Sequence, residues 1–202
     1  GDTILAIHIT AKLSGTYASA GAAAEELKGE FNIIPIDSAC GSLGIGLMCR
    51  EARKMERAGK SVDEIVKYIE SIKSNVTVIL TLDTLEYAKM SGRVKTLQAA
   101  LASLLNVKPI AVLQDGVLNM AEKVRTRKAA LDRVISMAKE QYGDQPVYLA
   151  VVHARDLRSG EALLEQAKSQ FNAKETMISE LAISIAANLG PGTVGLILYP
   201  AP

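Results

Sequence analysis

The chain has 202 residues, of which 49% are hydrophobic, and its 23 lysines and arginines nearly balance its 22 acidic residues. It is long enough to bury a sizeable core, and its near-zero net charge provides no field for recruiting nucleic acid or an anionic membrane. No apolar run approaches the ~20 residues of a membrane span, so stable membrane insertion is not expected. The two cysteines, Cys40 and Cys49, form no C-x-x-C pair. With no signal peptide at the start, this pattern predicts a reduced, cytoplasmic protein.

The first stretch of the chain predicts a strand, a loop and a helix. Residues 4–9 are aliphatic apart from His8 and suit a buried strand, whereas residues 18–27 are rich in helix formers and end before Gly29. Ser14 or Thr16 is expected to cap this helix. In such a unit the loop lies at the carboxyl edge of the sheet, where free backbone N–H groups and the helix dipole favour an anion.

A second strand-loop-helix unit follows, with a strand over residues 32–37 and a helix over residues 43–58. Ser61 and Glu64 then have the spacing of a capping box, which predicts the start of another helix. Isoleucines at helical spacing should form the buried stripe of that helix: Ile65, Ile69 and Ile72.

The pattern changes after Asn75, where residues 76–82 alternate threonine with apolar residues. We therefore expect two domains, residues 1–75 and 76–202. Asp115-Gly116 lies between two apolar runs and predicts a β-hairpin.

The other elements expected after Asn75 are helices over residues 84–90, 96–105, 126–141, 160–171 and 180–187, strands over 147–152, 176–178 and 194–199, and a tight turn over 188–192. Six strand candidates, two of them joined as a hairpin, favour an α+β domain after an incomplete α/β domain.

No standard catalytic set is present. His8 and His153 are far apart in sequence, and neither belongs to a metal-spaced cluster, so no metal or cofactor is expected. Ser14 has no recognisable base nearby, which makes it a better hydrogen-bond donor than nucleophile. His8 is predicted to be a core or sheet-face residue, and the role of His153 stays open.

Basic residues gather where a predicted strand passes into the next helix: Lys123, Arg125, Arg127 and Lys128. Cations at a helix start oppose its dipole, which favours an anionic partner. Ion pairs with Glu122 or Asp132 are the open alternative.

Several short motifs occur in one order along nearly the whole chain: ITAKLSGTYASA (9–20), IDS (36–38), LDTLEY (82–87), SGRV (91–94), LLNVKPI (104–110) with DG (115–116), KVRTRK (123–128) and GPG (190–192). Taken together, they resemble the DegV family. The resemblance implies an α/β N-terminal domain with a parallel sheet, truncated here, packed on an α+β C-terminal domain with a mixed or antiparallel sheet, and a lipid cleft between them.

The resemblance also implies a function without catalysis. Proteins of this family bind a long-chain fatty acid, and bacterial members present it to a separate fatty acid kinase subunit. The kinase phosphorylates the carboxylate so that the acyl chain can enter phospholipid synthesis.

By the same resemblance, Ser14 matches the serine that holds the carboxylate, in a loop completed by Gly15 and Thr16. Asn188 and Gly190 fall in a second ligand-binding motif of the family.

Arg93 and Arg125 match arginines implicated near the head group or the kinase contact.

The chain departs from the family pattern in two ways. Asn188 stands where the family has a histidine two residues before the G-P-G turn, so a donor is kept but its capacity for charge is lost. Bonds from charged donors are about twice as strong as neutral ones, so carboxylate binding should be weaker. The family also begins earlier, with a T-S-Q-P-S segment whose threonine holds the carboxylate, and this chain is expected to lack that segment.

Two alternatives stay open at this point. A small-molecule hydrolase or transferase acting at the Ser14 loop would need a base that the sequence does not supply. The other alternative is a fragment with no bound ligand. The residues at 18–24 and 101–105 suit the lining of an acyl tunnel, and ordinary core packing is the alternative for them.

Overall fold

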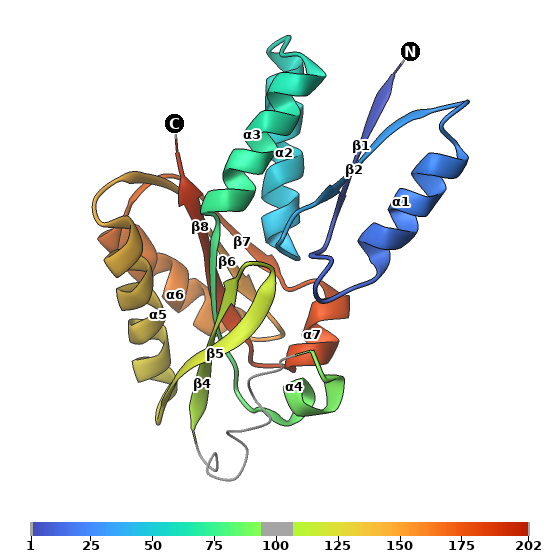
Figure 1. The fold of residues 1–202 in the computed structure, drawn as a ribbon. Helices are drawn as coiled ribbons and strands as arrows, with labels where there is room; N and C mark the ends of the chain where they lie inside the picture. Colours follow the sequence, from blue (N-terminus) through green and yellow to red (C-terminus); the bar gives the residue numbers. More distant parts are fainter. Residues whose placement is uncertain (1, 94–106, 202) are drawn as a thin grey trace. The chain divides into compact units, whose positions relative to one another are not determined.

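The computed structural model describes residues 2–93 and 107–201 (Figure 1). The helix predicted over residues 96–105 lies outside the described residues. The chain divides into two compact units, the first comprising the residues up to Asn75 together with the short segment Asp115–Val117, and the second the rest.

The first unit contains a two-stranded parallel sheet. Strand β1 (Thr3–His8) pairs with β2 (Asn32–Asp37) in a register that places His8 opposite Asp37. Helix α1 (Thr16–Glu26) connects the two strands and packs mainly on β2. Both predicted strands are confirmed, β2 with the expected bounds.

Two further helices complete this unit, α2 (Leu43–Arg57) and α3 (Val62–Asn75), which pack on each other. The predicted capping box is confirmed, because the Ser61 N–H donates to Glu64 Oε2 at 2.9 Å and the Glu64 N–H donates to Ser61 Oγ at 3.3 Å. The Ser61 N–H bond, followed by that from Lys60, lowers the pKa of Glu64 to about 2. The three predicted isoleucines of α3 are buried.

The second unit is built on a six-stranded mixed sheet with the strand order β5-β4-β3-β8-β6-β7. β6 and β7 are parallel, whereas β3 is antiparallel to β4 and β8, and β6 is antiparallel to β8. The strands are β3 (Thr77–Thr81), β4 (Lys108–Gln114), β5 (Val117–Val124), β6 (Pro146–His153), β7 (Asn172–Glu180) and β8 (Val194–Pro200). A parallel sheet and a mixed sheet in one α/β chain confirm the predicted fold class.

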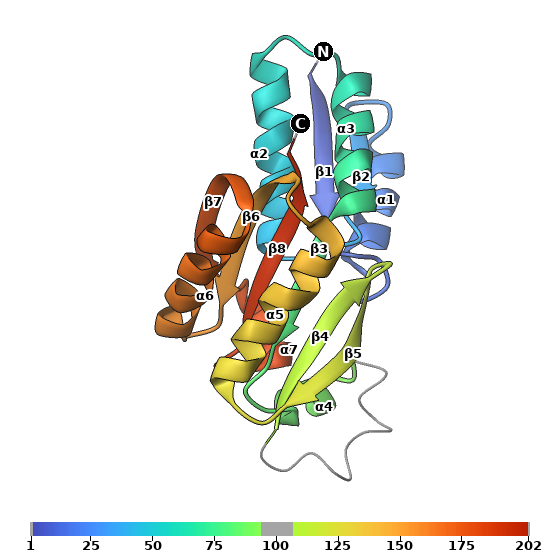
Figure 2. The ribbon, with the colours of Figure 1, turned by 90° about the vertical axis from the view of Figure 1, so that its left-hand side faces the viewer.

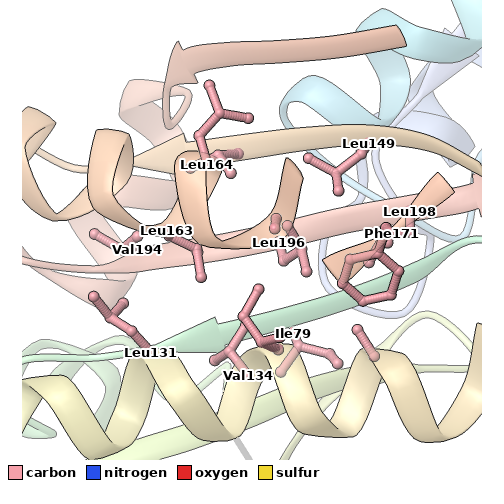
Figure 3. Close-up of a cluster of buried hydrophobic side chains, with 14 of the residues drawn as sticks. Ile79, Leu131, Val134, Leu149, Leu163, Leu164, Phe171, Val194, Leu196 and Leu198 are labelled. Carbon is pink, nitrogen blue, oxygen red and sulfur yellow. The ribbon is translucent and has the colours of Figure 1, made fainter. Parts of the chain in front are cut away.

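The helices of this unit are α4 (Glu86–Ser91), α5 (Arg127–Tyr142), α6 (Leu157–Gln170) and α7 (Ile183–Leu189). Figure 2 shows α5 and α6 side by side across one face of the six-stranded sheet. Between them and the sheet lies the main apolar cluster, to which α5 contributes Val134, α6 contributes Leu163 and the sheet contributes Leu149, Leu196 and Leu198 (Figure 3). Full burial of each such side chain stabilises the fold by about 1.5–3 kcal/mol.

One polar cluster is buried under α5. The Tyr142 hydroxyl lies 2.9 Å from Thr77 Oγ1 and 3.1 Å from the Leu198 carbonyl oxygen. Thr77 Oγ1 in turn donates to Gln141 Oε1 at 2.8 Å. These bonds join α5 to β3 and β8.

The strand predicted over residues 176–178 is longer in the structure, where β7 runs over Asn172–Glu180. Within the described part of the chain, β7 is an edge strand that pairs with β6 alone, and most of its side chains are exposed. An edge strand carries a weak apolar pattern, so the sequence marks only its middle.

The predicted hairpin is confirmed between β4 and β5. Asp115 and Gly116 have positive φ angles of 50° and 73°, as a two-residue type I′ turn requires. Within the first unit, Thr10 Oγ1 donates to the Gly116 carbonyl at 2.9 Å. A Cβ added to Gly116 would lie 2.3 Å from that same Thr10 Oγ1.

Gly116→Ala is therefore expected to lower the free energy of unfolding by about 2 kcal/mol or more, because it combines left-handed strain with displacement of the Thr10 hydroxyl. Gly59→Ala is the matched control, since Gly59 also has a positive φ of 75° but no atom within 4 Å of an added Cβ. It should cost only about 1 kcal/mol. Urea denaturation of both variants measures the difference, and equal losses would contradict a role for the Thr10 contact.

Candidate functional site

The loops that follow β1 and β2 are joined at the carboxyl end of the parallel sheet. Asp37 Oδ1 accepts from the Ala11 N–H at 3.2 Å and from the Ala39 N–H at 2.9 Å, so one carboxylate oxygen holds both loops. The Thr10 N–H donates to the Cys40 carbonyl at 2.9 Å, which adds a direct backbone bond between them.

Thr10 shapes the loop that leads to Ser14. Its carbonyl accepts from the N–H groups of Leu13 and Ser14, both at 3.2 Å, and its Oγ1 accepts from the Lys12 N–H at 3.3 Å. Thr10 is 1% exposed, so this arrangement is buried. The roles of Thr10 and Asp37 were not predicted, although a threonine or aspartate just after a strand is typical of turns closed by side chain to backbone bonds.

Ser14 and Thr16 lie together at the start of α1. Their hydroxyl oxygens are 2.7 Å apart, and Ser14 Oγ accepts from the Thr16 N–H at 3.3 Å. The prediction that one of them is the N-cap is wrong, because the N-cap residue is Gly15, which has no side chain to accept a hydrogen bond from the first helical turn. Ser14, one residue earlier, reaches the first helical N–H instead.

This arrangement leaves donors at the start of α1. The two hydroxyl groups share one hydrogen bond, so the hydrogen of the other hydroxyl is available to an acceptor. The N–H groups of Tyr17 and Ala18 lie in the first helical turn and have no intrahelical acceptor. No acidic residue occupies that turn, so the positive end of the helix dipole is not neutralised from within the helix.

The same loops contain no activated nucleophile or base among the described residues. Cys40 is buried, and burial raises the pKa of its thiol to about 11, so the thiol is neutral at pH 7. His8 Nε2 is buried without a hydrogen-bond partner, and no described histidine bonds Ser14. The described residues also hold no group of three or more metal-ligating side chains, and no described helix is long and apolar enough to cross a membrane.

In the second unit, the turn between α7 and β8 is tightly packed. Gly190 and Gly192 have φ angles of 87° and 78°. An added Cβ would lie 2.3 Å from the Tyr87 ring at Gly190 and 2.7 Å from Asp83 Cβ at Gly192. The fully buried Thr193 hydroxyl bonds the Gly190 carbonyl at 2.9 Å, so glycine is required at both positions and the turn is rigid.

Asn188 belongs to the last turn of α7, which corrects the prediction of a tight turn over residues 188–192. Its Nδ2 donates to the Ser184 carbonyl at 2.5 Å, within its own helix. The amide donor therefore points back along α7.

Arg93 and Arg125 are exposed, and neither forms an ion pair with a described acidic residue. Arg93 follows the left-handed Gly92 at the end of α4 and donates from Nη1 to the Ser91 carbonyl at 3.1 Å.

Arg127, and not Arg125, is the arginine of this segment that the fold holds. Its Nη2 donates to Asp156 Oδ2 and to the Gly192 carbonyl, both at 2.6 Å, and its Nε donates to Ser159 Oγ at 3.3 Å. Burial alone would raise the pKa of Asp156, but hydrogen bonds from Ser159 and Arg127 outweigh it and hold the pKa below its ordinary value. Arg127 thus fastens the starts of α5 and α6 to the α7–β8 turn.

The structure shows the ion pairs that Asp132 and Glu122 form. Lys128 Nζ pairs with Asp132 at 2.8 Å, as the open alternative of structural ion pairs predicts. Of the two acidic residues that the alternative named, Asp132 is therefore the one that pairs with the basic set. Glu122 pairs with Arg133 at 2.6 Å, and the pKa of Glu122 is lowered mainly by the hydrogen bond from Arg133.

The fold and the loop geometry define an α/β protein of two units, in which the start of α1 has no side-chain cap and lies beside the paired hydroxyl groups of Ser14 and Thr16. A family model described as "Uncharacterised protein, DegV family" matches residues 1–201. The chain belongs to the DegV family, which confirms the resemblance seen in its motifs.

Relatives with similar sequences and solved structures also belong to the DegV family. A DegV domain-containing protein of Listeria monocytogenes is 32% identical over 96% of this chain and 69% of its own. The solved structure of a fatty-acid-binding DegV family protein from Thermus thermophilus matches with a TM-score of 0.93 and 30% identity over 100% of this chain and 72% of its own. The fatty-acid-binding DegV family protein of Streptococcus agalactiae matches with a TM-score of 0.88 and 28% identity over 100% and 72%.

Proposed function

We propose that this protein binds a long-chain fatty acid and holds its carboxylate at the Ser14 loop. The observation that carries the proposal is the open start of α1, where a hydroxyl hydrogen and two backbone N–H groups have no acceptor of their own within the helix. The fatty-acid-binding relatives from Thermus and Streptococcus, at 30% and 28% identity, support a fatty acid as the ligand.

The loop suits a carboxylate in both charge and space. Hydrogen bonds from N–H and O–H donors to an ionised acceptor are short and strong, and the helix dipole adds to them. A Cβ added to Gly15 would meet no atom within 4 Å, so the space beside the loop is open. A carboxylate group can therefore approach the backbone closely at this residue.

The acyl chain would supply most of the affinity. Burial of each methylene stabilises by about 0.8 kcal/mol, so a long chain gains on the order of 10 kcal/mol without any catalytic residue. The carboxylate bonds then orient the ligand. Asn188 and Gly190 stay predictions of the family resemblance as further ligand-binding residues.

The alternative, a hydrolase or transferase acting at Ser14, has less support. A serine nucleophile needs a positioned base, and the described partners of the Ser14 side chain are the hydroxyl and N–H of Thr16. We favour a binding protein that carries out no reaction itself.

We further propose that the bound fatty acid is presented to a separate fatty acid kinase subunit, which phosphorylates the carboxylate toward phospholipid synthesis. Arg93 and Arg125 support this step, because exposed guanidinium groups without acidic partners suit the phosphate or acidic groups of a kinase complex.

Ser14→Ala is expected to weaken oleate binding about 10- to 100-fold, because a hydrogen bond to a charged group contributes about 1.5–3 kcal/mol. Isothermal titration calorimetry with oleate measures the change. Ser19→Ala is the matched control, since Ser19 is exposed one turn further along α1, and it should leave the affinity unchanged. Wild-type protein that binds no oleate and yields no acyl chain on organic extraction would sink the proposal, and equal affinity of the two variants would remove Ser14 from it.

Arg125→Ala or Arg93→Ala is expected to slow acyl phosphate formation about tenfold in a reaction with ATP and a fatty acid kinase subunit, while oleate affinity stays unchanged. Arg158→Ala, which removes an exposed arginine of α6, is the control and should have no effect. The rate is followed by trapping the acyl phosphate with hydroxylamine. If the arginine variants match the control, the proposed kinase contact is wrong.

A further inference from the structure

Three buried polar atoms in the second unit have no hydrogen-bond partner among the described residues: Thr81 Oγ1, Arg127 Nη1 and His153 Nδ1. Thr81 is fully buried, and His153 is 5% exposed. Roughly 90% or more of buried polar atoms in folded proteins are hydrogen-bonded, often through ordered water, so three such atoms near one end of the sheet require an explanation.

The sheet register places Thr81 and His153 on the same face. Thr81 ends β3 and pairs with Val194, and His153 ends β6 and pairs with the same Val194 of β8. Residues directly opposite each other on neighbouring strands point to one face of the sheet. Val194 belongs to the apolar cluster under α5 and α6, at the end where Leu131 and Leu163 also lie (Figure 3).

Arg127 lies over the same end of the sheet. It precedes the buried Leu131 by one helical turn and so shares its inward face of α5. Its Nη2 bonds the Gly192 carbonyl, two residues before Val194, and Asp156, three residues after His153. The other terminal nitrogen of Arg127, Nη1, is buried and has no hydrogen-bond partner among the described residues.

The start of α6 closes the same space from the other side. A Cβ added to Gly160 would lie 3.2 Å from His153 Cδ2, so the first turn of α6 approaches the imidazole closely. The hydroxyl, the imidazole and the guanidinium therefore surround the first residue of β8 beneath the starts of two helices.

We propose that this end of the sheet holds a buried site for at least two ordered water molecules. Thr81 and His153 are separated by two strand spacings, or roughly 10 Å. One water molecule with two hydrogen bonds spans only about 5.6 Å, so a single water cannot serve both side chains. One water bonds the Thr81 hydroxyl and another bonds the His153 ring, and Arg127 Nη1 donates to this pair from above.

Water fits the site better than an anion. Asp156 already neutralises Arg127 at 2.6 Å, so an anion would bring an uncompensated charge into a buried space. The helix starts also have their own acceptors, because Thr126 Oγ1 accepts from the Ala129 N–H and Asp156 Oδ1 accepts from the Ser159 N–H, both at 3.1 Å. Water accepts from the guanidinium and donates to either neighbour, and this inference does not depend on lipid binding.

The substitution Thr81→Val tests the site by the sign of its effect on the melting temperature. If the Thr81 hydroxyl bonds a water, removal of the hydroxyl leaves that buried water without one of its hydrogen bonds and lowers the melting temperature. Thr77→Val is the matched control, because Thr77 lies on the same strand and face and its hydroxyl has the described partners Gln141 and Tyr142. Both variants are expected to melt lower than the wild type. A melting temperature of Thr81→Val that is unchanged or raised would overturn the proposal, since it would mean that an unpaired buried hydroxyl had been replaced by a methyl group.

A crystal structure at about 1.5 Å resolution tests the same site directly. The expected result is one water within hydrogen-bond distance of Thr81 Oγ1 and another within that distance of His153 Nδ1. The absence of either water, direct pairing of these side chains with protein atoms, or an anomalous bromide peak at the site after a bromide soak would contradict it.

Discussion

The candidate site depends on one carboxylate oxygen. Asp37 Oδ1 accepts from Ala11 and Ala39, and so joins the loop after β1 to the loop after β2 at one edge of the parallel sheet. With Thr10 buried between them, the backbone N–H groups that lead to Ser14 are already paired. The donors left over are those at the start of α1, and these are the groups that we propose hold the anionic head group.

In the second unit, the side chain of Arg127 holds several chain segments together. Arg127 bonds the α6 cap residue Asp156 and the carbonyl of Gly192, and glycines at both ends of the G-P-G turn allow it to pack against Tyr87 and Asp83. The hydrogen bonds of Arg127 hold the backbone at the end of the six-stranded sheet, beyond the apolar cluster. The remaining buried polar atoms there are best satisfied by water.

Local signals made much of the fold predictable. The Asp115-Gly116 turn and the Ser61 capping box are specified by adjacent residues, and both form as expected. The full length of the edge strand β7 and the bonds of Arg127 could not be predicted from the sequence, because they depend on partners tens of residues away. At the site, the residue pattern predicted Ser14 or Thr16 as the helix cap, whereas the N-cap is Gly15, because the turn closed by the Thr10 carbonyl ends at Ser14.

The central claim is that hydrogen-bond donors at the Ser14 loop hold an ionised carboxylate. Carbon-13 NMR of carboxyl-labelled oleate, titrated with acid in the presence of the protein, tests it most directly. Donors to the charged form lower a carboxyl pKa, so the bound resonance should stay at its ionised position at pH values where free oleate is protonated. A bound resonance that titrates at or above the pKa of the free acid would contradict the account.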